Sequence, residues 1–246
     1  MRNSIFSLLI SVFALGCRSE YLAFDRHPPG LVPKVFAKDV ISKNDEHVGY
    51  CAFSPDGSVL YYAETTADWS TSKIIKISSR DLAKKETLYL KDKRYEGEPF
   101  ITRDGKTMYF TVILPPPEGK PWQSDIYRVH KTATGWGPPE LLGAPINSPA
   151  SEWHVSMTDK NVIYFVSERE KGTSALNGDI YRAEQKGDTF VNLTNLPYSI
   201  NTDYNDSDPL IAPDESFLIF HSNRAGGFGE HDLYISFNHD GKWLPH

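Results

Sequence analysis

Short apolar runs alternate with polar turns along most of the chain, and the alternation repeats. Four segments share one pattern, in which an apolar stretch, a turn with an aspartate and an aromatic stretch follow one another: Cys51–Glu64, Pro99–Val112, His154–Glu168 and Pro209–Asn223. The turn aspartates are Asp56, Asp104, Asp159 and Asp214, with spacings of 48, 55 and 55 residues. A period of this size indicates a propeller, a solenoid or another array of one supersecondary unit.

Each segment has the features of a β-hairpin. Asp56-Gly57 and Asp104-Gly105 lie between apolar runs, where aspartate bonds its own backbone and glycine accepts a positive φ. A further strand is predicted at three Asp-x-Tyr triplets, which begin at Asp125, Asp179 and Asp232. With a looser fourth strand, each repeat becomes a four-stranded sheet, and such sheets arranged radially make a propeller. The pattern predicts an all-β chain: a β-propeller with four recognisable four-stranded repeats, either as a closed ring or as an incomplete ring of five or six blades.

The repeat resembles the TolB-type, WD-repeat-like β-propeller repeat of bacterial envelope proteins. The matching stretches are Phe53–Gly57, Ala212–Glu215, Ser222–Gly229 and the Asp-Ile/Leu-Tyr triplets, and the resemblance covers about residues 32–243. It implies the fold more than the function, because such propellers have many roles. It also implies that residues 34–42 form an outer strand that completes the last blade and closes the ring.

The first 17 residues have the features of a targeting segment. An apolar run from Ile5 to Leu15 is too short to span a bilayer, and it ends just before Gly16 and Cys17. The segment resembles a bacterial lipoprotein signal, which predicts lipidation of Cys17; an ordinary secretory signal is the alternative. The predicted organisation is a signal peptide at 1–17, a linker at 18–33 and a propeller domain at 34–246. The predicted location is the periplasmic face of the bacterial envelope, lipid-anchored, with the outer membrane favoured.

Charge and motifs narrow the function. A net charge of −6 provides no basic surface for nucleic acid. The chain has no Gly-x-Ser-x-Gly, His-Glu-x-x-His or Cys-x-x-Cys motif, and its glycine-rich loop at 226–229 lies between strands rather than before a helix. No cofactor is predicted, apart from a divalent cation as an open alternative.

Acidic residues and a histidine precede the predicted inner strands, at Glu98, Glu152, His154 and Asp208. Inner strands line a propeller axis, so these side chains could converge there and bind a divalent metal ion. The alternative is that each side chain caps a strand end and bonds loop amides within its own blade.

Three tryptophans are further candidates for ligand binding, and the repeated aspartates are expected to have structural roles. Trp69, Trp122 and Trp153 have no repeat equivalents and are candidate ligand-binding residues, through stacking on sugars or anchoring of a protein partner. Trp136 and Trp243 are repeat equivalents and are expected to pack between blades. Asp125, Asp179 and Asp232 recur in successive repeats and are expected to be structural, paired within each blade with an arginine such as Arg169 or Arg224.

The leading functional prediction is a non-catalytic binding or scaffold propeller, lipid-anchored in the bacterial envelope, that binds an envelope protein or a cell-wall glycan. The alternative is a metal-assisted carbohydrate-active enzyme, an oligosaccharide lyase or hydrolase on a TolB-like propeller. A degenerate copy without a stable function is the third possibility.

Overall fold

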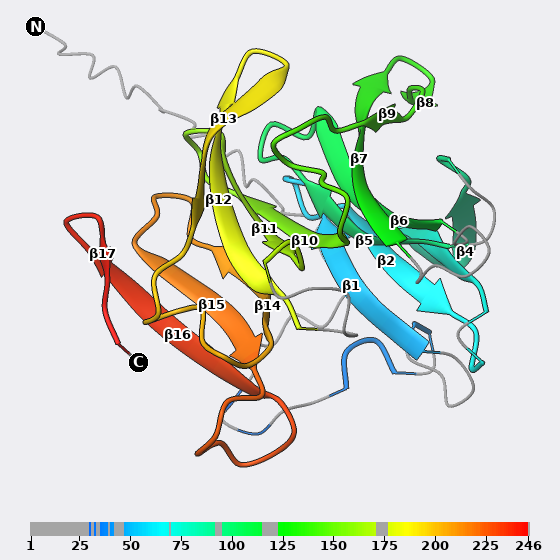
Figure 1. Ribbon diagram of the computed structural model, residues 1–246. Helices are drawn as coiled ribbons and strands as arrows, with labels where there is room; N and C mark the ends of the chain where they lie inside the picture. The colour runs from blue at the N-terminus through cyan, green and yellow to red at the C-terminus, as the bar shows by residue number, and fades with distance from the viewer. Residues whose placement is uncertain are drawn as a thin grey trace, which may run out of the picture.

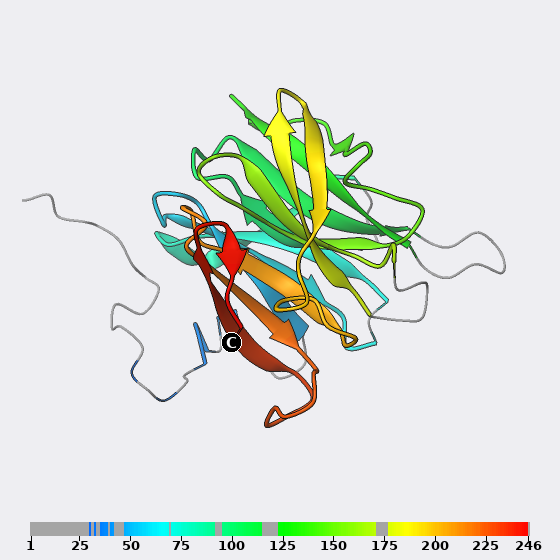
Figure 2. The same cartoon turned by 60° about the vertical axis from the view of Figure 1, so that its left-hand side comes forward.

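The structure is a computed structural model that describes residues 30, 32, 35–38, 40–41, 47–68, 70–91, 95–114, 123–170 and 177–245. These residues form four antiparallel sheets, here called blades one to four, and contain no helix. Figures 1 and 2 show the blades in chain order around a common axis. The predicted all-β class and the four-repeat propeller are confirmed. No helix in this part of the chain is long and apolar enough to cross a membrane.

Seventeen strands make up the blades. Blade one contains β1 (His47–Phe53), β2 (Val59–Thr65), β3 (Ser72–Ser78) and β4 (Asp81–Leu88). Blade two contains β5 (Glu96–Ile101), β6 (Thr107–Leu114), β7 (Gln123–Thr132), β8 (Gly135–Trp136) and β9 (Glu140–Leu141), the last two both paired with β7. Blade three contains β10 (Glu152–Met157), β11 (Val162–Ser167), β12 (Asp179–Lys186) and β13 (Thr189–Asn195). Blade four contains β14 (Asp206–Ile211), β15 (Phe217–Ser222), β16 (Asp232–His239) and β17 (Lys242–Trp243).

The hairpin between the first two strands of each blade turns on a residue with positive φ: Gly57, Gly105, Asn161 and Glu215. In blades one, two and four the preceding aspartate accepts a hydrogen bond from the backbone N–H two residues later, as at Asp56 and Ser58. In blade three, Lys160 takes the place of this aspartate, and one residue is missing after Asn161. Asp159 lies one position earlier and pairs with Arg103 of blade two at 2.9 Å. The alignment of all four turns on an aspartate therefore needs correction at Asp159.

The blades pack in sequence around the axis. Inner strand β1 contacts β5, β5 contacts β10, and β10 contacts β14. Among the described residues, no strand of blade four contacts a strand of blade one, so the ring of blades has an open side there. We call the side of a blade toward the next blade in the chain its forward face, and the opposite side its back face.

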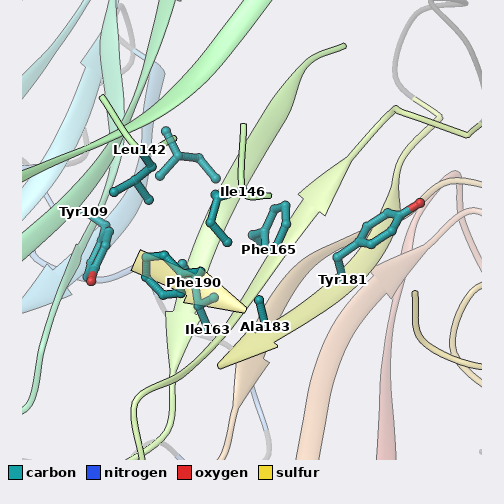
Figure 3. Packing of buried hydrophobic residues seen from close by; sticks show 9 residues of the cluster. Tyr109, Leu142, Ile146, Ile163, Phe165, Tyr181, Ala183 and Phe190 are labelled. Atoms are coloured by element: carbon teal, nitrogen blue, oxygen red, sulfur yellow. The ribbon is translucent and has the colours of Figure 1, made fainter. Parts of the chain in front are cut away.

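One repeating contact holds the core together: the forward face of each blade packs on the back face of the next. Tyr109 and Ile126 of blade two, for example, pack on Ile163 and Phe165 of blade three, together with Phe190. Figure 3 shows this cluster, with Leu142 and Ile146 of the connecting segment filling the space beside it. Equivalent clusters join blade one to two and blade three to four. Burial of aromatic and branched side chains is thus the main stabilising contribution.

The two repeat-equivalent tryptophans reach back to the preceding blade. The Trp136 ring lies 6.1 Å from that of Tyr61 in blade one, and the Trp243 ring lies 6.3 Å from that of Tyr164 in blade three, both edge to face. The expectation that they pack between blades is confirmed.

The expected closing strand at residues 34–42 is wrong for the part of it that the structure describes. Ala37 accepts hydrogen bonds from the N–H groups of Val40 and Ile41, which makes a turn. Ala37, Val40 and Ile41 pack on Leu60, Tyr62, Ile75 and Ile77, the back face of blade one. Blade four instead obtains its outer strand from β17. The segment is apolar enough to cover a sheet face, and blade one is the first blade among the described residues.

Candidate axial binding site

Each inner strand carries a β-bulge, and one residue at each bulge adopts positive φ: Tyr50, Glu98, His154 and Asp208, with φ of 50°, 55°, 49° and 52°. A bulge re-aims a side chain and is common beside functional sites. Positive φ costs a non-glycine residue about 1–2 kcal/mol, so four equivalent strained residues indicate a selected geometry. All four lie seven positions before the positive-φ turn residue of their blade.

Asp208 lies between two histidines. Its Oδ1 is 2.5 Å from Nε2 of His154 in blade three, and its Oδ2 is 2.8 Å from Nδ1 of His221 on β15. Burial opposes ionisation of Asp208, but the two histidines outweigh it and hold the pKa of this carboxyl well below its usual range. Burial also opposes the charged form of His154 and by itself would lower its pKa. The carboxylates of Glu98 and Asp208 outweigh burial, so the pKa of His154 is raised. Both partners are therefore stabilised in their charged forms.

Glu98 extends the network to blade two. Its Oε2 accepts hydrogen bonds from Thr111 Oγ1 at 2.6 Å and from the backbone N–H of His154 at 2.9 Å, and it lies 3.4 Å from His154 Nδ1. Thr111 and His221 occupy equivalent positions of β6 and β15, each beside the bulge residue of its own blade. The chain from Glu98 to His221 thus connects three blades at the axis.

Tyr50 brings blade one into the same site. Its ring centroid lies 4.9 Å from that of His154. Burial first, and then the nearby carboxylates of Glu98 and Asp208, raise the pKa of the Tyr50 hydroxyl well above its usual value. The phenol is therefore neutral and able to donate a hydrogen bond.

A cavity of about 420 Å³ lies at this point of the axis, lined by the four bulge residues and by neighbours such as Pro99, Phe100, Val155 and Pro209. A second cavity of about 640 Å³ lies at the hairpin-turn end of blades two to four and shares Phe100, Ile101 and Leu210 with the first. The combination of an aromatic ring, carboxylates and histidines in a concave site is suited to a small polar ligand.

Of the four residues proposed from the sequence as metal ligands, the structure brings Glu98, His154 and Asp208 together but not Glu152. Glu152 is fully buried within blade three, where it accepts hydrogen bonds from the Ser148 backbone N–H and from the hydroxyls of Ser148 and Ser167. No group of three or more His, Cys, Asp or Glu side chains in the described part of the chain is arranged to hold a metal ion. Each of the two axial carboxylates has protein partners in this structure: Asp208 pairs with two histidines, and Glu98 accepts hydrogen bonds from a hydroxyl and a backbone N–H.

Glu152 belongs to a separate set of buried acids two positions before the bulge, with Glu96 and Asp206. Each bonds the segment that connects the preceding blade to its own strand: Glu96 accepts a hydrogen bond from the Leu90 N–H, and Asp206 accepts one from the Thr202 N–H. Of the four residues proposed as metal ligands, only Glu152 thus follows the alternative of local bonds, whereas Glu98, His154 and Asp208 contact one another across blades. Glu152 and Asp206 each bind an arginine, at 3.3 Å for Arg169 and 2.5 Å for Arg224.

The repeated Asp-x-Tyr aspartates have local contacts. Asp179 accepts a hydrogen bond from the Asn195 side chain, and Asp232 accepts hydrogen bonds from the N–H groups of Phe228 and Gly229. Burial raises the pKa of Asp125, and the nearby Glu152 raises it further. The expectation that these aspartates pair with Arg169 and Arg224 is wrong. Arg169 and Arg224 instead bind the buried acids and stack on the tyrosine of each triplet, 4.9 Å above Tyr181 and 4.7 Å above Tyr234.

Of the three tryptophans proposed as ligand contacts, the structure describes only Trp153. Trp153 lies on β10, packed against the cluster between blades three and four, and its buried Nε1 has no hydrogen-bond partner among the described residues. Trp69 and Trp122, and also Cys17, lie outside the described residues. The structure adds two axial residues that the sequence argument missed, Tyr50 and His221. Alignment of the repeats on the positive-φ turn residue finds Tyr50 directly.

Comparison with known proteins gives the fold. No family model matches the chain, and no curated protein matches it. Among solved structures it is similar to TolB from Acinetobacter baumannii, with 16% identity and a TM-score of 0.56 over 83% of this chain and 44% of that one. It is similar to a puromycin-hydrolysing peptidase from Mycobacterium tuberculosis, with 13% identity and a TM-score of 0.52 over 81% of this chain and 30% of that one. The chain spans less than half the length of either protein, and its fold is a β-propeller similar to that of TolB.

Proposed function

We propose that this chain is a binding or scaffold β-propeller of the bacterial envelope, lipid-anchored through Cys17, with a cell-wall glycan as the ligand of its axial site. The observation that supports the proposal is the convergence of Tyr50, Glu98, His154 and Asp208 on one cavity of about 420 Å³. A tyrosine ring provides a stacking surface for a sugar ring, and carboxylates accept hydrogen bonds from its hydroxyl groups.

The state of the carboxylates favours binding over catalysis. Asp208 is engaged by two histidines, and Glu98 by a threonine hydroxyl and a backbone N–H. These contacts fix the two side chains in one geometry, which is how preorganised recognition groups are held. A general acid needs a proton that it can release, and Asp208 is held ionised by its partners.

Titration calorimetry with soluble oligosaccharides of N-acetylglucosamine and N-acetylmuramic acid tests the ligand. We expect Tyr50→Ala and Glu98→Gln each to weaken binding about tenfold or more, as loss of a stacking ring or a charged acceptor does. Tyr198→Ala, at an exposed residue of the β13–β14 connection, is the matched control and should bind as the parent does. Equal affinity of all variants, or no binding by the folded parent, would contradict the glycan proposal.

A second candidate, an oligosaccharide lyase or hydrolase, rests on one feature. His154 is held between two carboxylates with a raised pKa, as a proton donor in an active site is. Reducing-end assays on the same oligosaccharides test it, and product formation lost in His154→Asn would favour the enzyme. The metal-assisted form of this candidate predicts a stoichiometric divalent ion by elemental analysis. Labelling with a radioactive fatty acid, lost in Cys17→Ser, tests the lipid anchor.

A further inference from the structure

The forward faces of blades one to three are each covered by the next blade, whereas no described strand covers the forward face of blade four. Four residues occupy the same position of the third strand in blades one to four: Ile74, Ile126, Ile180 and Leu233. The three isoleucines are fully buried by the blade that follows them, whereas Leu233 is 80% exposed. Its neighbours on the same face, Ile235 and Phe237, are 41% and 54% exposed. Figure 1 shows β16 at the edge of the described molecule with no blade beyond it.

The residue types on this face also differ. At the position of Ile235 the preceding blades carry Lys76, Arg128 and Arg182, and at the position of Ile219 they carry Tyr61, Tyr109 and Tyr164. Arg182 and Tyr164 bond Glu215 of blade four, at 3.1 Å and 2.8 Å. The tyrosine and the cation on the forward face of blade three thus bind an acidic residue of the next blade. Blade four has replaced both with isoleucine.

The absence of a cation here bears on which partner can bind. In a contact related by a two-fold axis, residues near the axis face their own copies, so a central arginine would be placed against a second arginine. Burial of such a like-charged pair is strongly unfavourable. A face with Leu233, Ile235 and Phe237 at its centre carries no such penalty and can pack on itself as two sheets of a β-sandwich do.

A head-to-tail arrangement of two copies is disfavoured by blade one. Among the described residues its back face is the other face at an end of the row of blades, and Ala37, Val40 and Ile41 already cover it. The forward face of blade four of one copy therefore has no free back face to bind on the next copy. We propose that this face, formed by Leu210, Ile219, Leu233, Ile235 and Phe237, is a homodimer interface in which two copies pack it against itself about a two-fold axis.

Sedimentation equilibrium of the purified full chain, from about 1 to about 100 µM, tests the proposal. We expect a monomer–dimer equilibrium in the parent. Ile235→Arg, which restores the residue type of blades two and three, should raise the dissociation constant by about a hundredfold or more, because two buried cations then face each other. Leu233→Asp should act in the same way, and because Leu233 is 80% exposed in the monomer, we expect the variant to fold as the parent does. Leu141→Arg, at an exposed residue of β9 in blade two, is the matched control and should dimerise as the parent does.

Each outcome decides the proposal. Loss of the dimer in both blade-four variants but not in Leu141→Arg supports it, provided that the thermal melts of all the variants remain cooperative. A parent that stays monomeric over the whole range overturns it, and so does a dimer that persists in Ile235→Arg and Leu233→Asp. A stable complex between the monomer and a different protein, lost in the same two variants, identifies a heterologous partner and also overturns self-association.

Discussion

His154 and Asp208 join two blades across the propeller axis, with 2.5 Å between Nε2 of the one and Oδ1 of the other. Both residues are at bulges with positive φ, so the backbone of each strand is bent to bring the pair together. The contact is more than packing, because it connects the two charged groups whose pKa values are shifted in opposite directions. It also determines where the carboxylate and the imidazole face the axial cavity.

Asp208→Asn is expected to lower the free energy of unfolding by about 1–3 kcal/mol at pH 6, because it leaves two partly buried histidines without their charged acceptor. Urea denaturation of the parent and the variant measures the difference. His221→Gln is the matched comparison, since it removes only one of the two contacts and should have a smaller effect. A stability equal to that of the parent would show that the pair contributes nothing to the fold.

The contribution of His154 to stability should depend on pH with a definite sign. A raised pKa in the folded protein means that folding favours the protonated imidazole, so its contribution is full below the unfolded pKa of about 6.5 and disappears as pH rises through the folded value. The parent minus His154→Gln difference in unfolding free energy should therefore be largest near pH 5–6 and decrease toward pH 9. Asp208 has a lowered pKa, so its own contribution is lost only in acid, below about pH 4. A difference that grows with rising pH contradicts this assignment.

Arg224→Ala should destabilise the chain by about 3–5 kcal/mol, because it leaves the fully buried carboxylate of Asp206 without its cation. It also removes the stack on Tyr234. Arg103→Ala is the control, since its ion pair with Asp159 is exposed on both sides and should contribute at most about 0.5 kcal/mol. Guanidinium melts of the two variants, compared with the parent, measure both effects. Similar losses in the two would mean that the buried arginine contributes no more than the exposed one.

Glycine substitution at two equivalent turn residues separates backbone strain from contact between blades. Asn161 and Glu215 both have positive φ where blades one and two have glycine. Asn161→Gly should be neutral or stabilising by about 0.5–1 kcal/mol, since glycine adopts this conformation freely. Glu215→Gly should destabilise by about 1–3 kcal/mol in spite of the same relief, because Tyr164 and Arg182 lose their acceptor. Thermal melts give both values, and a stabilised Glu215→Gly would refute the role of the interblade bonds.

The repeat could be predicted because the residues within each turn specify the conformation of that turn. Gly57 and Gly105 follow aspartate, and this dipeptide specifies a tight turn whatever surrounds it. Blade three departs at one point: Asn161 takes the glycine role and the turn is one residue shorter, so Asp159 aligned with the wrong position. The position of the positive-φ turn residue, rather than that of the aspartate, sets the register of the repeat.

The site could be predicted only in part, because it depends on bulges and on strand pairing. Glu152 and His154 are two positions apart, and alternation alone places them on the same face of a strand. The bulge after Trp153 separates them, and Glu152 remains inside its blade while His154 reaches the axis. His221 comes from a second strand and meets Asp208 only through the pairing of β14 with β15. The sequence contains no local signal for either effect.

Because the ring has an open side, the contacts between successive blades set the width of the axial cavity. Since no described strand of blade four contacts a strand of blade one, the separation of Tyr50 from Asp208 depends on the interfaces between successive blades and on the contacts of His154 with both residues. Small rotations at each interface add together at the axis. A substitution such as Glu215→Gly, which removes an interblade contact but no residue that lines the cavity, should therefore change the width of the axial cavity.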